Sequence, residues 1–258
     1  PERWERARVE VTYQDRILGG NVTKRADYCI SNIPLPVLKN RDNIKANFSD
    51  EFEWAVQQGT FADTCKVGWQ ANERFWETKN QIYGGISWID NIITQMWYPS
   101  NDYFSKKGTL TGAYNFRDRA KVLGDMSLSE RLRVARQGAE KLHPEFANTQ
   151  LVPEAQGLSI AWQNVPFQLG GWANWNPDNP DDDKAYGRLL KPDGPNGQFW
   201  IVGDQVSTLP GWQEGAMMSA EHVVYLIAAP ETRRLGAADS VQAPDTRSIV
   251  EGSFSYNR

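Results

Sequence analysis

One segment, residues 199–220, limits the possible folds of this chain more than any other. Residues 199–202 form a short apolar run, which is typical of a buried strand in a parallel sheet. Gly203-Asp204 follows, and α/β sheets place ligands at the carboxyl ends of such strands. After a loop, a helix is predicted from near Trp212 to about Ala228, and its first N–H groups favour a developing anion. The segment predicts an α/β fold with a binding turn. The alternative is an ordinary strand-loop-helix unit with an exposed aspartate.

Composition excludes several classes of protein. The chain has 258 residues, 40% of them hydrophobic, and a net charge of −4, so it lacks the basic surface that nucleic acid requires. No apolar run is long enough to predict a membrane span, and no signal peptide is visible. Cys29 and Cys65 are predicted to be free buried thiols, and with only two histidines no metal site is expected. The compartment stays open between cytoplasmic and periplasmic or secreted.

Local patterns predict alternating strands and helices. Ser127 and Glu130 form a capping box, and its helix should end at His143-Pro144, with His143 as a surface or C-terminal helix residue and not a catalyst. Residues 174–197 are rich in Pro, Asn, Asp and Gly and predict a surface loop, and residues 232–258 predict an extended tail. Another helix is expected over 50–58, and strands over 9–13, 26–33, 64–77, 81–86, 92–98, 108–115 and 158–162.

The central segment is also similar to a known motif. Val-Gly-Asp204 followed by Gly211-Trp-x-x-Gly-Ala216 resembles the C-terminal flavin-binding motif of the flavin amine oxidases, above all the L-amino-acid oxidases. The resemblance implies that the acid contacts the FAD chain and that Gly-Trp and the following helix lie against the isoalloxazine ring. The implied cofactor-binding residues are Lys66, Trp162, Gly203, Asp204, Gly211, Trp212, Gln213 and Ala216.

Three upstream positions extend the resemblance. Lys66, with Phe-Trp nine positions later, is similar to the family lysine that reaches flavin N5 through a water. Tyr114 matches the tyrosine that binds the substrate carboxylate, and Trp97 matches an aromatic residue of the side-chain pocket. From the residues alone, a solvated lysine and ordinary sheet aromatics are the alternatives.

A fourth segment, Trp162 followed by Gly170-Gly171-Trp172, resembles the family segment that faces the substrate over the flavin. Trp172 and Trp212 are therefore expected to flank the substrate, unless Trp172 turns into the core. The resemblance implies catalytic roles for Lys66, Tyr114, Trp172 and Trp212. It implies substrate contacts for Trp97, Tyr114, Trp172, Gly211 and Trp212.

One family motif is missing. No Gly-x-Gly-x-x-Gly turn occurs, and the arginine that pairs with the substrate carboxylate is also expected upstream. The resemblance therefore implies one chain of a processed two-chain enzyme, with a companion chain that carries the dinucleotide-binding turn, and a higher oligomer of that unit.

The implied fold is mixed α/β: part of a glutathione-reductase-like FAD-binding domain (residues 1–58 and 166–230), a substrate domain with a mixed sheet flanked by helices (59–165), and a tail (231–258). The implied reaction is oxidative deamination of an L-amino acid by hydride transfer to flavin N5, giving a 2-oxo acid, ammonia and hydrogen peroxide. Alternatives are an amino-acid 2-monooxygenase, a monoamine or polyamine oxidase, and a flavin-free structural subunit.

Overall fold

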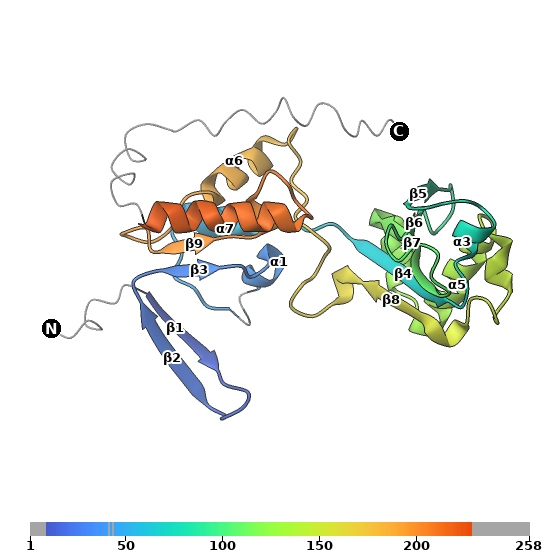
Figure 1. Ribbon diagram of the computed structural model, residues 1–258. Helices are drawn as coiled ribbons and strands as arrows, with labels where there is room; N and C mark the ends of the chain where they lie inside the picture. Colours follow the sequence, from blue (N-terminus) through green and yellow to red (C-terminus); the bar gives the residue numbers. More distant parts are fainter. Residues whose placement is uncertain (1–8, 41, 43, 229–258) are drawn as a thin grey trace. The chain divides into compact units, whose positions relative to one another are not determined.

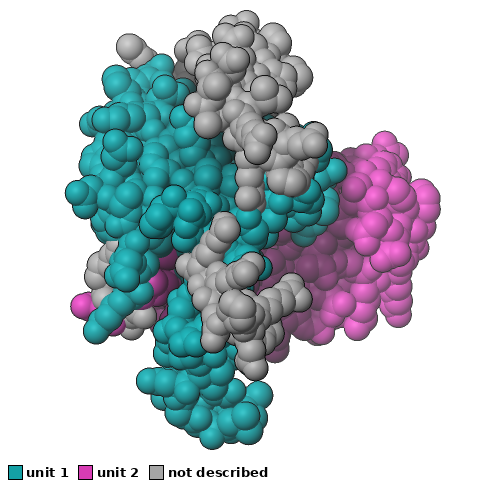
Figure 2. Space-filling view, turned by 90° about the vertical axis from the view of Figure 1, so that its left-hand side faces the viewer, with its two compact units in different colours: residues 1–33, 45–59, 175–258 teal, residues 34–44, 60–174 magenta. Residues whose placement is uncertain are grey.

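The structure is a computed structural model that describes residues 9–40, 42 and 44–228. The chain divides into two compact units. Unit 1 comprises residues 1–33, 45–59 and 175–258, and unit 2 comprises residues 34–44 and 60–174 (Figure 2). The mixed α/β class is confirmed. The predicted tail over 231–258 lies outside the described residues.

Unit 1 is built around two parallel strands, β3 (Cys29–Ser31) and β9 (Phe199–Ile201). Helix α7 (Gln213–Ala228) packs on this pair and buries Val223 in a cluster with Trp200 and Val202 (Figure 1). Between strand and helix lies a single 3-10 turn, η5 (Asp204–Val206). The predicted buried parallel strand and the helix that follows it are therefore confirmed.

Strands β1 (Val9–Gln14) and β2 (Asn21–Ala26) form an antiparallel hairpin (Figure 1). The predicted half-buried strand over 9–13 is mostly exposed instead, because both hairpin strands turn most of their side chains to solvent. The predicted strand over 26–33 shortens to β3, because Ala26 already pairs with Val9 in the hairpin.

The sequence prediction of a loop over 174–197 is wrong, because α6 (Pro180–Leu189) occupies its middle. The Asn179 side chain accepts a hydrogen bond from the backbone N–H of Asp181, and Pro180 occupies the first turn. Three aspartates in the same turn, 181–183, complement the positive end of the helix dipole. The Asn, Pro and Asp residues that predicted a loop therefore form the N-terminus of α6.

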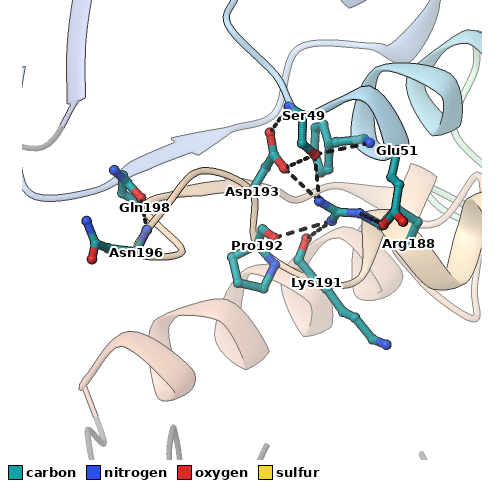
Figure 3. Close-up of polar contacts among 9 residues, drawn as sticks. Ser49, Glu51, Arg188, Lys191, Pro192, Asp193, Asn196 and Gln198 are labelled. Atoms are coloured by element: carbon teal, nitrogen blue, oxygen red, sulfur yellow. Dashed lines mark hydrogen bonds and ion pairs between the residues drawn. The ribbon is translucent and has the colours of Figure 1, made fainter. Parts of the chain in front are cut away.

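A buried carboxylate ties α6 to α2 (Asp50–Gln58), the helix predicted over 50–58. Asp193 accepts hydrogen bonds from the Ser49 N–H at 2.9 Å, the Ser49 hydroxyl at 2.6 Å and Arg188 at 2.6 Å (Figure 3). Ser49 is the N-cap of α2, and Arg188 lies in the last turn of α6. Asp193 also forms backbone hydrogen bonds with Phe199, so this cluster fixes the chain just before the binding turn.

Unit 2 contains a five-stranded sheet of order β5-β6-β7-β4-β8 (Figure 1). The strands are β4 (Thr64–Ala71), β5 (Gly85–Trp88), β6 (Gln95–Tyr98), β7 (Gly108–Phe116) and β8 (Gly157–Ala161). The described pairings of this sheet are antiparallel, so the mixed sheet predicted for the substrate domain is wrong, and the parallel pairing of the fold lies in unit 1.

Helices cover one face of this sheet. Val67 and Trp69 of β4 pack in the same core as Ala135 and Ala139 of α5. The helices of unit 2 are α1 (Leu35–Leu38), α3 (Phe75–Thr78), α4 (Arg117–Gly124) and α5 (Leu128–Glu140), with the short 3-10 turns η2 (Pro144–Ala147), η3 (Glu154–Gln156) and η4 (Trp162–Asn164).

Several predicted boundaries in unit 2 need correction. The long strand over 64–77 ends at Ala71, because the chain then forms helical hydrogen bonds, from the Thr78 N–H to the Arg74 carbonyl and from the Lys79 N–H to the Phe75 carbonyl. Strand β5 begins at Gly85 rather than at Gln81, since Gln81, Gly84 and Gly85 all have positive φ. The strand predicted over 92–98 begins only at Gln95.

The capping box at the start of α5 is half confirmed. The Ser127 hydroxyl accepts a hydrogen bond from the Glu130 N–H, as a capping box requires. The Glu130 carboxylate, however, accepts hydrogen bonds from Arg133 rather than from the backbone N–H of Ser127. His143, predicted as a surface or C-terminal helix residue, follows the end of α5 but is only 4% exposed. Its Nε2 lies 2.6 Å from the Tyr98 hydroxyl, and its ring packs edge-on against Phe75.

Within the described part of the chain, every helix is too short or too polar to cross a bilayer. Cys29 and Cys65 are free, as predicted, but only Cys65 is buried, and Cys29 is partly exposed.

Candidate functional site

A β-bulge in β7 determines which of its side chains face away from the helices of unit 2. Register between β4 and β7 shifts at Gly112: Val67 pairs with Ala113, and Gly68 pairs with Thr111. Leu110 and Ala113 are therefore both buried in the core, while Thr111 and Tyr114 both lie on the other side, here called the open face. Gly112 is required there, because a Cβ would lie 2.7 Å from the Trp69 ring.

Lys66 and Tyr114 are direct partners across β4 and β7 on the open face. The Lys66 Nζ lies 4.3 Å from the centre of the Tyr114 ring, a cation–π contact. Burial lowers the pKa of the Lys66 ammonium and raises the pKa of the Tyr114 phenol to about 12. The site therefore presents a cation beside a hydroxyl that stays protonated at neutral pH.

Tyr114 belongs to a row of four aromatic rings, here called the aromatic row: Trp97, Tyr114, Phe116 and Trp172. Successive ring centres are 6.0, 4.6 and 5.6 Å apart, which are ordinary aromatic contact distances. The sequence prediction included three of these rings but missed Phe116. Phe116 could have been predicted from its position, because it lies two residues after Tyr114 and therefore on the same face of β7.

Gly170 and Gly171 allow the close chain packing that places the Trp172 ring beside Phe116 in the aromatic row. Gly170 has φ of 149°, and a Cβ on it would lie 2.3 Å from the Cβ of Phe61. A Cβ on Gly171 would lie 2.5 Å from the Thr64 hydroxyl. The Ala62 N–H donates to the Trp172 carbonyl at 2.8 Å, so the segment lies against the chain entering β4. Trp172 contacts Phe116, which argues against the alternative that it turns into the core.

Trp162, the other residue of that motif, begins η4 directly after β8. Its carbonyl accepts the Gly170 N–H at 3.0 Å, so it anchors the glycine pair through its backbone. Within the described residues, its indole makes no ring contact with the aromatic row.

In unit 1 the binding turn follows β9. Gly203 has φ of 114°, a conformation that only glycine adopts readily, and its N–H donates to the Ser219 hydroxyl of α7 at 2.8 Å. The Asp204 Oδ2 accepts the Gly211 N–H at 2.8 Å. The carboxylate is thus held in one orientation at the end of the strand, as a group that binds hydroxyls requires.

The start of α7 packs against the loop before it and leaves Trp212 exposed. A Cβ on Gly215 would lie 2.3 Å from the Leu209 carbonyl, so the loop packs directly on the helix backbone. Ala216 donates its N–H to the Trp212 carbonyl, and Gln213 is the first helical residue. The Trp212 ring is 64% exposed and offers a flat apolar surface beside the helix start. These features fit a cofactor that carries both a flat ring and hydroxyl groups.

The structure thus brings together Lys66, Trp97, Tyr114 and Trp172 within unit 2. Within unit 1 it gathers the remaining predicted residues around the turn and the helix start: Gly203, Asp204, Gly211, Trp212, Gln213 and Ala216. The described residues contain no group of three or more His, Cys, Asp or Glu side chains that could hold a metal ion.

Comparison with known proteins identifies relatives of the whole described region. The family described as flavin containing amine oxidoreductase matches residues 3–228. A flavin-dependent L-tryptophan oxidase from Lentzea aerocolonigenes is 29% identical over 213 residues, which are 82% of this chain and 43% of the relative. L-amino-acid oxidase 4 from Hebeloma cylindrosporum is 24% identical over 225 residues, or 81% of this chain and 36% of the relative.

Solved structures show the same fold. A redesigned putrescine oxidase superimposes with a TM-score of 0.66 at 17% identity, covering 86% of this chain and 46% of that one. Wild-type putrescine oxidase bound to putrescine gives a TM-score of 0.60 at 18% identity, covering 81% of this chain and 44% of that one. The chain therefore spans less than half the length of these relatives.

Proposed function

Since the chain belongs to the flavin containing amine oxidoreductase family, we propose that it supplies the substrate-binding face of an L-amino-acid oxidase. The relatives named as L-tryptophan oxidase and L-amino-acid oxidase support this choice of substrate class. The observation that carries the proposal is the pairing of Lys66 with Tyr114 on the open face, with the aromatic row beside them.

The cofactor is FAD, in keeping with a flavin-containing family and a flavin-dependent relative. Asp204 would hold hydroxyl groups of the cofactor chain, and Gly203, Gly211 and Ala216 would let it approach the backbone. Trp212 and Gln213 would lie near its ring. When bound, FAD accepts two electrons from the substrate and passes them to dioxygen.

Each side chain of the open face has a distinct part in this proposal. Tyr114, protonated because its pKa is raised to about 12, donates a hydrogen bond to the substrate carboxylate. Trp97, Phe116 and Trp172 exclude water and contact the substrate side chain. Lys66 supplies a fixed positive charge that stabilises negative charge developing on dioxygen. No residue is assigned as a general base.

Product analysis distinguishes L-amino-acid oxidation from the 2-monooxygenase reaction. The flavin-loaded enzyme, which includes the dinucleotide-binding segment proposed below, is incubated with L-amino acids under air, and the products are identified by mass spectrometry with a coupled peroxide assay. An oxidase gives equal amounts of 2-oxo acid, ammonia and hydrogen peroxide. An amide with loss of carbon dioxide would instead indicate a 2-monooxygenase, and an absence of turnover with every amino acid would contradict the proposal.

We also propose that a second polypeptide segment completes unit 1. The parallel pair β3–β9 has only two strands, whereas parallel sheets are stable when larger and covered on both faces. Helix α7 buries Gly215, Ser219 and Val223, yet its other faces expose large apolar side chains: Met217, Met218, Val224 and Tyr225. A dinucleotide-binding half, on a companion chain or the same polypeptide, would cover these surfaces and hold the pyrophosphate.

Co-expression tests this second proposal. A segment that carries the dinucleotide-binding turn should co-purify with this chain and give a complex with a flavin spectrum, while this chain alone should retain little FAD. Tight FAD binding by this chain alone would overturn it. The predicted chain processing, higher oligomer and compartment stay predictions.

A further inference from the structure

Gln95 is a buried polar residue that neither the motif resemblance nor the proposed chemistry uses. It pairs with Trp88 at the end of the β5–β6 hairpin and is only 4% exposed. Its Oε1 accepts a hydrogen bond from the Trp97 indole N–H at 2.7 Å. A tryptophan ring that is 40% exposed is normally free to change rotamer, but this bond fixes its plane.

The backbone before Gln95 is held in an unusual conformation. Thr94 has φ of 61°, which is a genuine outlier for a β-branched residue. Two hydrogen bonds hold the loop just before this residue: the Ile93 N–H donates to Asn91 Oδ1 at 2.9 Å, and the Asn115 side chain donates to the Ile92 carbonyl at 2.7 Å. Strain that the surrounding structure maintains in this way indicates a functional constraint.

The same loop connects Gln95 to the substrate-facing strand. The Tyr114 N–H donates to the Ile93 carbonyl at 3.2 Å, and Gln95 donates its own N–H to that carbonyl at 2.6 Å. The backbone of Tyr114 and the backbone of Gln95 therefore share one acceptor. The position of the Trp97 ring is thus fixed relative to Tyr114 from two directions, through the loop and through the 6.0 Å ring contact.

We propose that Gln95 is a positioning residue that fixes the Trp97 indole and thereby gives the site selectivity for aromatic over aliphatic amino-acid side chains. This inference rests on the proposed function. With the substrate carboxylate at Tyr114, the side chain extends along the aromatic row toward Trp97. An aromatic side chain gains from stacking on a ring of fixed orientation, whereas an aliphatic one gains only from burial of its area.

Three variants test the proposal in the flavin-loaded enzyme. Gln95→Leu removes the acceptor, Gln95→Glu keeps an acceptor oxygen, and Trp97→Phe removes the donor while leaving Gln95 intact. Gln70→Leu is the matched control, because Gln70 is an exposed glutamine on β4 that points to the same face as Lys66. KM and kcat are measured for L-phenylalanine, L-tryptophan, L-leucine and L-isoleucine.

Gln95→Leu should raise KM for the two aromatic substrates about tenfold, which is the usual effect of one lost hydrogen bond, and leave KM for the aliphatic substrates within about twofold. kcat should change little. Gln95→Glu should restore most of the selectivity, and Gln70→Leu should have no effect. In the Trp97→Phe background, Gln95→Leu should add nothing further, since the donor is already absent.

The possible failures can be told apart. A wild-type enzyme that oxidises no amino acid overturns the proposed function and, with it, this inference. If amino acids are oxidised but Gln95→Leu changes KM equally for all four substrates, or adds its full effect to that of Trp97→Phe, the inference alone is overturned.

Discussion

The Nζ of Lys66 lies 4.3 Å from the ring centre of Tyr114, its direct partner on the neighbouring strand. The pair places a cation next to a protonated phenol on a sheet face that also carries three further aromatic rings. Such a face can bind an anionic group through the hydroxyl and stabilise a developing negative charge through the ammonium. The predictions below follow from this arrangement and from the packing that maintains it.

Loss of the Lys66 charge should slow the reaction of the reduced enzyme with dioxygen. We expect Lys66→Met to lower that rate by about 10²-fold, with little change in the rate of reduction by substrate, because removal of one preorganised electrostatic group has an effect of this size. Stopped-flow mixing of the reduced enzyme with oxygenated buffer separates the two steps. An unchanged oxygen rate, or an equal loss in both steps, would contradict the assignment.

The pH dependence of the oxygen reaction should reflect the titration of Lys66. Burial lowers the pKa of this ammonium, so the charge is lost on the alkaline side at a pH below the ordinary lysine value of about 10.4. The oxygen rate should therefore fall as pH rises through that lowered pKa. Lys66→Arg, which stays protonated, should remove this alkaline decline, and persistence of the decline in that variant would assign it to another group.

Gly112 should be essential for the stability of unit 2. An added Cβ would lie 2.7 Å from the Trp69 ring, so Gly112→Ala should destabilise the fold by about 1–3 kcal/mol through overpacking. The matched control is Gly187→Ala in α6, where a Cβ meets nothing within 4 Å and should stabilise by about 0.5–1 kcal/mol. Urea unfolding measures both; equal effects would show that the bulge tolerates a side chain.

The stability of the protein should fall at acidic pH because of His143. Burial lowers its pKa, and the Glu145 charge offsets this only in part, so the unfolded chain binds the proton at a higher pH than the folded chain does. Stability should then decrease as pH falls through the unfolded value of about 6.5, by up to about 1.4 kcal/mol per pH unit. In His143→Phe this slope should be smaller. An unchanged slope would place the effect elsewhere.

Much of this structure was predictable because its signals are local. The apolar run, the Gly-Asp turn and the helix of residues 199–228 are adjacent in sequence, and the structure confirms the parallel strand and the helix. Helix α6 was missed because Asn179, Pro180 and the aspartates after them suit a turn as well as a helix N-terminus. Only packing against α2 distinguishes the two.

The open face was harder to predict because it depends on one extra residue in β7. Strict alternation places Tyr114 on the same side as Leu110 and Gly112, which are core positions, and the bulge reverses this relationship. Phe116 and Gln95 were missed for a related reason. The family resemblance gives neither residue a role, and their importance comes from contacts with Trp172 and Trp97 that only the folded chain shows.

The most direct test of the central claim compares an amino acid with the amine that has the same side chain. Peroxide production by the flavin-loaded enzyme is measured with L-phenylalanine and with 2-phenylethylamine, for wild type and for Tyr114→Phe. Wild type should prefer the amino acid, and Tyr114→Phe should lower kcat/KM for the amino acid about tenfold or more while leaving the amine unchanged. A wild-type enzyme that prefers the amine, or a variant that loses both substrates equally, would contradict carboxylate recognition by this face.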